Sequence, residues 1–185
     1  MTDVLIYQQT SSAFDQLIKR IIEHWQDTRF PQQPYDPQWV SPCQKEIDEN
    51  GLVAWQPELR EHPLDLSATE DALDLCFHPS LSVFYGRYYS ETIDVTFTNN
   101  QSFAFVQVWN DDDGLRLQEN IIAHILMQRK LKQTETVFIA TTEDDFKVVS
   151  MINHSGEIVL ETLGKDQRQH LSDNLAEFLS QLQPA

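Results

Sequence analysis

The residue types that most often perform chemistry in proteins are present in this chain, but their spacing fits no common metal-binding motif. Six histidines occur, and no two of them stand in an HxH or HExxH arrangement. Cys76 and His78 form a close pair, which is a weak signal without further ligands nearby. His124 falls within a predicted helix, where a structural hydrogen bond is the simpler explanation. The sequence therefore predicts no site built from histidine and cysteine.

Three consecutive aspartates, Asp111 to Asp113, are a second candidate for metal binding. Oxygen ligands suit Mg²⁺, but adjacent side chains rarely converge on one ion, and a helix N-terminus also favours acidic residues. The chain has no GxSxG segment, and its five glycines provide no phosphate-binding loop. No cysteine–histidine pair is identifiable as a nucleophile with its base. We predict that the protein is not an enzyme and that it binds no cofactor and no metal.

The strongest chemical signal is negative charge in the middle of the chain. The sequence has 29 Asp and Glu against 13 Lys and Arg, a formal net charge of -16. Residues 46–113 contain 14 of the acidic residues and two basic ones, Arg60 and Arg87. Such a chain repels nucleic-acid phosphates and anionic lipid, so we predict neither nucleic-acid binding nor direct lipid insertion. A basic protein is its electrostatic complement.

Two explanations fit this concentration of charge. A solvated acidic surface keeps a protein soluble and needs no partner. A binding face is favoured by Glu70 and Asp74, which lie four residues apart on one predicted helix face, where like charges are destabilising. The acids that we predict to form a partner-binding acidic face are Glu58, Glu61, Glu70, Asp71, Asp74, Asp111, Asp112 and Asp113.

Length and composition limit the class of protein. A chain of 185 residues that is 41% hydrophobic suits a single domain, residues 1–185, with a substantial core. Cys43 and Cys76 have no CxxC spacing, which favours two reduced thiols. The N-terminus lacks the features of a signal peptide, and no apolar run approaches the ~18 residues of a membrane span. We expect a soluble cytoplasmic protein.

Hydrophobic periodicity predicts four helices. The first covers about residues 12–26, with Ser11 or Ser12 as its N-cap. Ser67 and Glu70 have the spacing of a capping box, which opens a helix over about residues 68–77. A long helix follows the aspartate triplet and extends to about Lys132. The last helix carries its apolar face on Leu171, Leu175, Phe178, Leu179 and Leu182.

Short apolar segments separated by turns predict strands. Asn99 and Asn100 tolerate the positive φ of a tight hairpin, and the prolines within residues 30–43 favour an extended surface segment. Residues 81–90 fit either a helix or a strand. Because short turns join antiparallel neighbours, we predict an α+β domain with a mostly antiparallel sheet of about five to six strands and helices packed on one face. The predicted strands are residues 51–55, 92–98, 101–109, 136–141, 146–152 and 157–161.

Several longer segments are distinctive when they are taken together. They are WQP at 55–57, FYG at 84–86, QVWNDDD at 107–113, RLQENIIAHILMQRKLKQ at 116–133, TVFIAT at 136–141, SGEIVLETLG at 155–164 and HLSDNLAEFLSQLQP at 170–184. The chain that carries them resembles the Syd family of SecY-interacting proteins of Gram-negative bacteria, nearly from end to end. The resemblance implies an α+β fold, in a superfamily that includes toxin-immunity proteins and whose members mostly bind other proteins.

The same resemblance implies a partner and a location. Syd proteins are cytoplasmic, sit peripherally on the inner membrane through the SecY channel, act in quality control of the SecYEG translocon, and are described as having an acidic concave surface for SecY. Cytoplasmic loops of membrane proteins are enriched in Lys and Arg, so the predicted acidic face would complement them. The alternative function is an acidic immunity-type inhibitor of a basic toxin domain. A hydrolase or metal enzyme would need a pocket of convergent titratable groups. The oligomeric state is left open.

Overall fold

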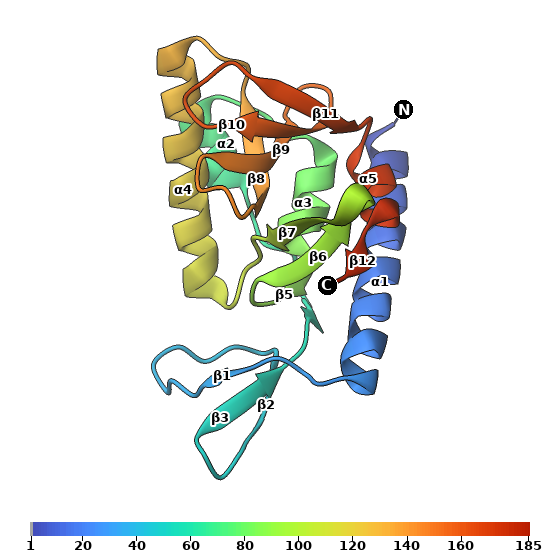
Figure 1. Ribbon diagram of the computed structural model, residues 1–185. Coiled ribbons are helices and arrows are strands. Elements are labelled where there is room, and N and C mark those ends of the chain that lie inside the picture. The colour runs from blue at the N-terminus through green and yellow to red at the C-terminus, as the bar shows by residue number, and fades with distance from the viewer. Residues whose placement is uncertain (1) are drawn as a thin grey trace.

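The computed structural model describes residues 2–185, apart from the side chain of Asn99, and its largest element is a seven-stranded antiparallel sheet (Figure 1). The strand order is β11-β10-β9-β8-β7-β6-β12, and every neighbouring pair is antiparallel. The predicted α+β class and its mainly antiparallel sheet are confirmed. The strands are β6 (Ile93–Phe97), β7 (Gln101–Phe105), β8 (Thr136–Thr141), β9 (Lys147–Ile152), β10 (Ile158–Thr162), β11 (Arg168–Ser172) and β12 (Gln183–Pro184).

Residues 2–185 form five α-helices that pack beside this sheet, with α1 and α4 on opposite sides of the molecule in Figure 1. Helices α3 and α5 both pack on α1, and the hydroxyls of Thr10 and Ser80 join α1 to α3 at 3.1 Å. Helix α4 packs on β8 and on α2. The helices are α1 (Asp3–Asp27), α2 (Ser67–Leu73), α3 (Pro79–Gly86), α4 (Asp111–Leu131) and α5 (Leu175–Gln181).

Two small sheets complete the fold. Strands β1 (Gln32–Pro34), β3 (Leu52–Trp55) and β2 (Gln44–Ile47) form a sheet that projects from the main body (Figure 1). Strands β4 (Glu58–Leu59) and β5 (Tyr88–Tyr89) form the other. A hydrogen bond connects the projecting sheet to the main body. The ring nitrogen of Trp109 donates to the carbonyl of Trp39, which lies between β1 and β2, at 2.9 Å.

Aromatic side chains form the centre of the core. The ring of Phe84 on α3 stacks on Phe14 of α1 at 5.5 Å and meets Phe105 of β7 edge-on at 5.2 Å. All three side chains are fully buried, and burial of each contributes roughly 1.5–3 kcal/mol before entropy is counted. This cluster fixes the N-terminal helix against the sheet.

The N-terminal helix is longer than predicted. It begins at Asp3, with Thr2 as its N-cap, so the expected cap at Ser11 or Ser12 is wrong. Residues Val4 and Leu5 of its first turns are exposed. The apolar pattern of a helix appears only where the helix packs against the rest of the protein. In the sequence this pattern therefore begins near Phe14, although the helix itself begins at Asp3.

The second helix is also capped differently from the prediction. It spans Ser67–Leu73, and Asp74 ends it in the left-handed region at φ 48°. The carboxylate of Glu70 accepts a hydrogen bond from the Phe77 backbone nitrogen at 2.6 Å, so no capping box forms with Ser67. Cys76 follows the end of the helix and is exposed, Cys43 is buried, and both thiols are free as expected.

The C-terminal segment alternates between strand and helix. Leu171 belongs to strand β11, and helix α5 begins only at Leu175, after the Asn174 N-cap. The chain then adds β12, which pairs with β6. The ambiguous segment at residues 81–90 resolves into helix α3 followed by β5. Among the helices of residues 2–185, none is long and apolar enough to cross a membrane.

Candidate functional site: an acidic pocket at the start of helix α4

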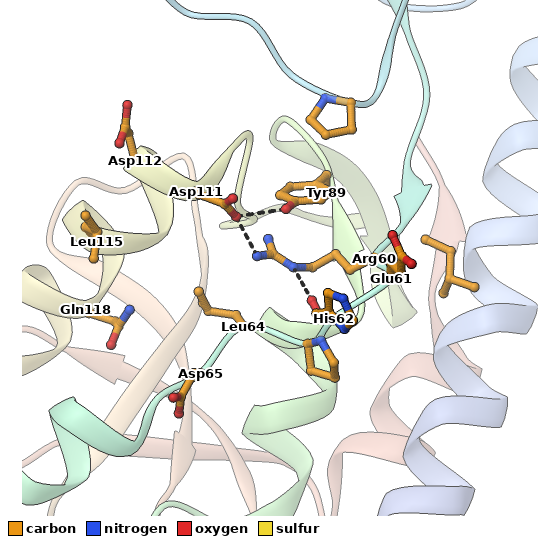
Figure 2. Close-up of a pocket in the computed structure, with 13 residues that line it drawn as sticks. Arg60, Glu61, His62, Leu64, Asp65, Tyr89, Asp111, Asp112, Leu115 and Gln118 are labelled. Atoms are coloured by element: carbon orange, nitrogen blue, oxygen red, sulfur yellow. Dashed lines mark hydrogen bonds and ion pairs between the residues drawn. The ribbon is translucent and has the colours of Figure 1, made fainter.

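A cavity of about 670 Å³ opens between the first turns of α4 and the loop that joins β4 to α2 (Figure 2). Four carboxylates line it, two from the β4–α2 loop and two from α4. Leu59 and Leu115 stand on its wall and are unusually exposed for leucines, at 55% and 62%. The cavity therefore combines negative charge with accessible aliphatic surface. We call it the acidic pocket; its carboxylates are Glu61, Asp65, Asp111 and Asp112.

One arginine, Arg60, lies inside the acidic pocket. Its guanidinium carbon is 3.8 Å from the centre of the Tyr89 ring, and its Nη2 is 2.9 Å from Oδ1 of Asp111. Its Nε donates to the His62 carbonyl at 3.3 Å, as the dashed lines of Figure 2 show. Nη1 is buried and has no hydrogen-bond partner among the described residues. Arg60 is thus held in one position, with part of its hydrogen-bonding capacity unused.

The start of α4 determines how its three aspartates are used. Asn110 is the N-cap and accepts from the Asp113 backbone nitrogen at 2.9 Å, while the Asp113 carboxylate accepts from the Trp109 nitrogen at 2.9 Å. This pair of hydrogen bonds satisfies one otherwise free helix donor and the backbone nitrogen just before the N-cap, so Asp113 serves the start of the helix. Asp111 faces Arg60, and Asp112 points away from it (Figure 2). Both carry charge that the helix N-terminus stabilises.

The opposite wall depends on close packing and on a turn. Leu64 packs against α4 at Gly114, where an added Cβ would lie 3.0 Å from Leu64 Cδ1, so the loop approaches the helix closely because this residue is glycine. Asp65 accepts from the Ser67 backbone nitrogen at 2.9 Å. Hydrogen bonds from Ser67 lower the pKa of Asp65, which keeps this carboxylate ionised at neutral pH.

The acids predicted on α2 lie outside the pocket, beside a part of α4 that is farther from its N-terminus. Thr69 donates to Gln118, which lines the pocket, whereas Arg129 donates to the Leu73 carbonyl. Gln118 and Arg129 are about 16 Å apart along the axis of α4 at 1.5 Å per residue. Glu70, Asp71 and Asp74 therefore do not line the pocket, and Glu70 uses an oxygen on the Phe77 nitrogen.

The structure thus brings together only part of the predicted set. Glu61, Asp111 and Asp112 share the pocket, while Glu58 lies on β4 and pairs with Lys45 at 3.9 Å. Asp65, Arg60 and the exposed leucines were not predicted. The sequence did contain one signal for this site. Arg60 is one of only two basic residues within 46–113, and acidic residues stand close to it on both sides.

A second cavity provides a useful comparison. It has a volume of about 430 Å³, lies beside α1, and shares Leu59 with the acidic pocket. Both of its carboxylates have cationic partners, Asp15 with Arg87 at 2.5 Å and Glu23 with Lys19 at 3.8 Å. In the acidic pocket, of the described ion pairs, only one involves a lining carboxylate, that of Asp111 with Arg60. Unbalanced negative charge therefore distinguishes the acidic pocket from this second cavity.

Another cluster of titratable groups lies inside the protein, between α4 and the sheet. Glu161 accepts from Thr136 at 2.7 Å and Ser150 at 2.6 Å, and lies 3.5 Å from His124 and 3.3 Å from Arg168. Burial alone would raise the pKa of Glu161, but hydrogen bonds from His124, Ser150 and Thr136 lower it overall. The two hydroxyl residues are fully buried, so they cannot meet a substrate. Within residues 2–185 no three His, Cys, Asp or Glu side chains form a metal-binding group.

The fold and the pocket define an α+β protein with a mainly antiparallel sheet and an acidic recess at a helix N-terminus. A family model described as Syd protein (SUKH-2) matches residues 11–184. A Protein Syd from Psychromonas ingrahamii is 42% identical over 177 residues, which cover 95% of this chain and 96% of that protein. A Protein Syd from Pseudoalteromonas translucida is 38% identical over 185 residues, 99% of each chain. The chain belongs to the Syd family.

Proposed function

We propose that this protein is a non-enzymatic binding module that docks its acidic face onto basic cytoplasmic loops of the SecY translocon channel. Membership of the Syd family supports SecY as the partner. The observation that carries the docking mechanism is the acidic pocket, in which Glu61, Asp65 and Asp112 are offered to a ligand. A loop rich in Lys and Arg, as cytoplasmic loops of membrane proteins are, would match those charges.

The pocket suits a peptide better than a single ion. Leu59 and Leu115 provide aliphatic contact surface beside the carboxylates, and a cavity of about 670 Å³ accommodates several side chains. Charge complementarity of this kind mainly speeds association and selects the partner, while apolar contacts slow dissociation. A loop with alternating basic and aliphatic residues would use both features.

The proposal includes a location and a role. An acidic body gains nothing from anionic lipid, so its presence on the cytoplasmic side of the inner membrane would depend on SecY. Occupying the cytoplasmic loops would let the protein report on or regulate the SecYEG complex, in keeping with a quality-control role. In this proposal the protein performs no chemistry on SecY.

Binding to inner-membrane vesicles that contain SecYEG tests the proposal. We expect binding that weakens steeply between low and physiological salt, and no binding to protein-free liposomes of the same lipids. The triple variant E61Q/D65N/D112N should bind at least about tenfold more weakly. A matched control, D27N/E143Q/D145N, removes the same charge from exposed acids outside the pocket and should bind like the parent. Equal loss in both triples, or binding to bare liposomes, would refute docking through the pocket.

The immunity-type alternative uses the same charge with a different partner. Capture experiments from a membrane extract distinguish the two, because docking on the translocon predicts that SecY is retained and is lost with the E61Q/D65N/D112N variant. Retention of a soluble basic toxin domain by the same carboxylates would favour the alternative.

A further inference from the structure

The feature of the acidic pocket that simple charge attraction does not explain is Arg60. Its positive charge lies at the centre of a site that is otherwise suited to cations. A basic ligand is repelled by it, so Coulomb forces alone would make Arg60 unfavourable for binding. Its side chain is nevertheless only 4% exposed and is fixed on three sides, by Tyr89, Asp111 and the His62 carbonyl.

The unused donor of Arg60 indicates what it offers. Nη1 is buried and lacks a partner among the described residues, whereas Nε and Nη2 each donate to an oxygen. A buried donor without an acceptor destabilises the folded protein, and a ligand oxygen that reaches the donor recovers that loss. Arg60 itself lines the acidic pocket, so an oxygen of a ligand bound there approaches its guanidinium.

The surrounding charges decide which kind of oxygen fits. An incoming carboxylate or phosphate would meet Glu61, Asp65 and Asp112, while the charge of Arg60 is already balanced by Asp111. A neutral acceptor has no such repulsion. A main-chain carbonyl is the neutral acceptor that every peptide carries, and in an extended peptide the flanking side chains can turn toward the acids and toward Leu59 and Leu115.

We propose that Arg60 is a specificity-determining residue of the acidic pocket, whose Nη1 donates to a main-chain carbonyl of the bound basic peptide. The site then recognises a peptide chain and not positive charge alone. Lysine cannot replace this arginine, because its ammonium is a compact charge, whereas the guanidinium fork pairs with Asp111 and keeps a second donor free. This inference rests on the proposed docking function.

The test compares two cations that differ in whether they carry carbonyl groups. One is a peptide of lysine and leucine, acetylated at its N-terminus and amidated at its C-terminus, with as many positive charges as spermine. The other is spermine, which has no hydrogen-bond acceptor when protonated. Affinities of the full-length protein and its R60K variant are measured by calorimetry at low salt, with thermal unfolding of both proteins as a check on folding.

We expect R60K to bind the peptide about tenfold more weakly, the effect of losing one hydrogen bond from a charged donor, and to bind spermine as the parent does. Equal peptide affinity for R60K and the parent would overturn the inference, because the charge alone would then suffice. Parallel loss of peptide and spermine binding would also overturn it, since Arg60 would only support the pocket. The docking proposal fails separately, if the parent binds neither ligand or if E61Q/D65N/D112N binds both unchanged.

Discussion

Arg60 and Asp111 form an ion pair whose two members have opposite environments. The guanidinium side chain is 4% exposed and the carboxylate side chain is 79% exposed, although Nη2 and Oδ1 are 2.9 Å apart. Tyr89 covers the guanidinium face and donates its hydroxyl to the same Oδ1 at 2.8 Å. Burial and then this contact with Asp111 raise the pKa of the Tyr89 hydroxyl, which keeps it a donor. The pair joins the β4–α2 loop to α4 and so holds two walls of the acidic pocket together.

Substitutions of the adjacent residues Asp112 and Asp113 should have different effects, one on partner binding and the other on stability. Asp113→Ala removes the acceptor for the Trp109 nitrogen and should lower the free energy of unfolding by about 1 kcal/mol, with SecY binding retained. Asp112→Ala should cost only a few tenths of a kcal/mol, through the helix dipole, and should weaken binding to SecY vesicles. Urea unfolding and vesicle binding of both variants measure this. A reversed pattern, with Asp113 controlling binding, would mean that the helix cap is not its main role.

The secondary structure was largely predictable wherever the apolar pattern repeated. Helix α4 follows the predicted segment because its buried residues recur at the helix period. Strands β8, β9 and β10 follow theirs because each is a short, largely apolar run between turns, buried at consecutive positions. Strand β11 was missed, since four of its five residues are polar and its pattern is weak. The β12 strand is two residues long and exists only through its pairing with β6.

The pocket was less predictable than the fold, because it is assembled from distant segments. Asp111 and Arg60 are 51 positions apart, and no local pattern pairs them. Charge density identified Glu61, Asp111 and Asp112, but it also selected acids with other uses, such as Glu70 on the Phe77 nitrogen. Local hydrogen bonding of a carboxylate depends on loop conformation, which side-chain type alone does not reveal.

Two glycines with similar backbone angles should respond differently to alanine. Gly156 and Gly164 have φ of +80° and +75°. A Cβ on Gly156 would lie 2.6 Å from Nε2 of His78, whereas a Cβ on Gly164 meets nothing within 4 Å. Gly164→Ala should cost about 1 kcal/mol from backbone strain, and Gly156→Ala should cost about 1–2 kcal/mol more, because the imidazole must move. Thermal and urea unfolding check this. Equal losses of stability in the two variants would show that the His78 ring moves away from the added Cβ at no cost.

The buried carboxylate of Glu161 should make stability depend on acid. In Glu161→Gln the amide oxygen can still accept from Thr136 and Ser150, but the oxygen that faces Arg168 becomes an amide donor and the buried Arg168 loses its anionic partner. The substitution should therefore lower the free energy of unfolding at neutral pH by about 3 kcal/mol. The pKa of Glu161 in the folded protein lies below its ordinary value of 4.5. Its contribution is therefore fully present above that ordinary value and is lost as the pH falls through the lower, folded value.

Urea unfolding of the parent and of Glu161→Gln, followed from neutral pH into the acid range below 4.5, tests this dependence. The stability difference between the two proteins should shrink on acidification, because the parent must then bind a proton that the glutamine variant never binds. Glu143→Gln, an exposed acid in the β8–β9 turn, should show almost no difference from the parent at any pH. A gap between parent and Glu161→Gln that stays constant into acid would mean that lost packing or hydrogen-bond geometry, and not the charge, accounts for the destabilisation.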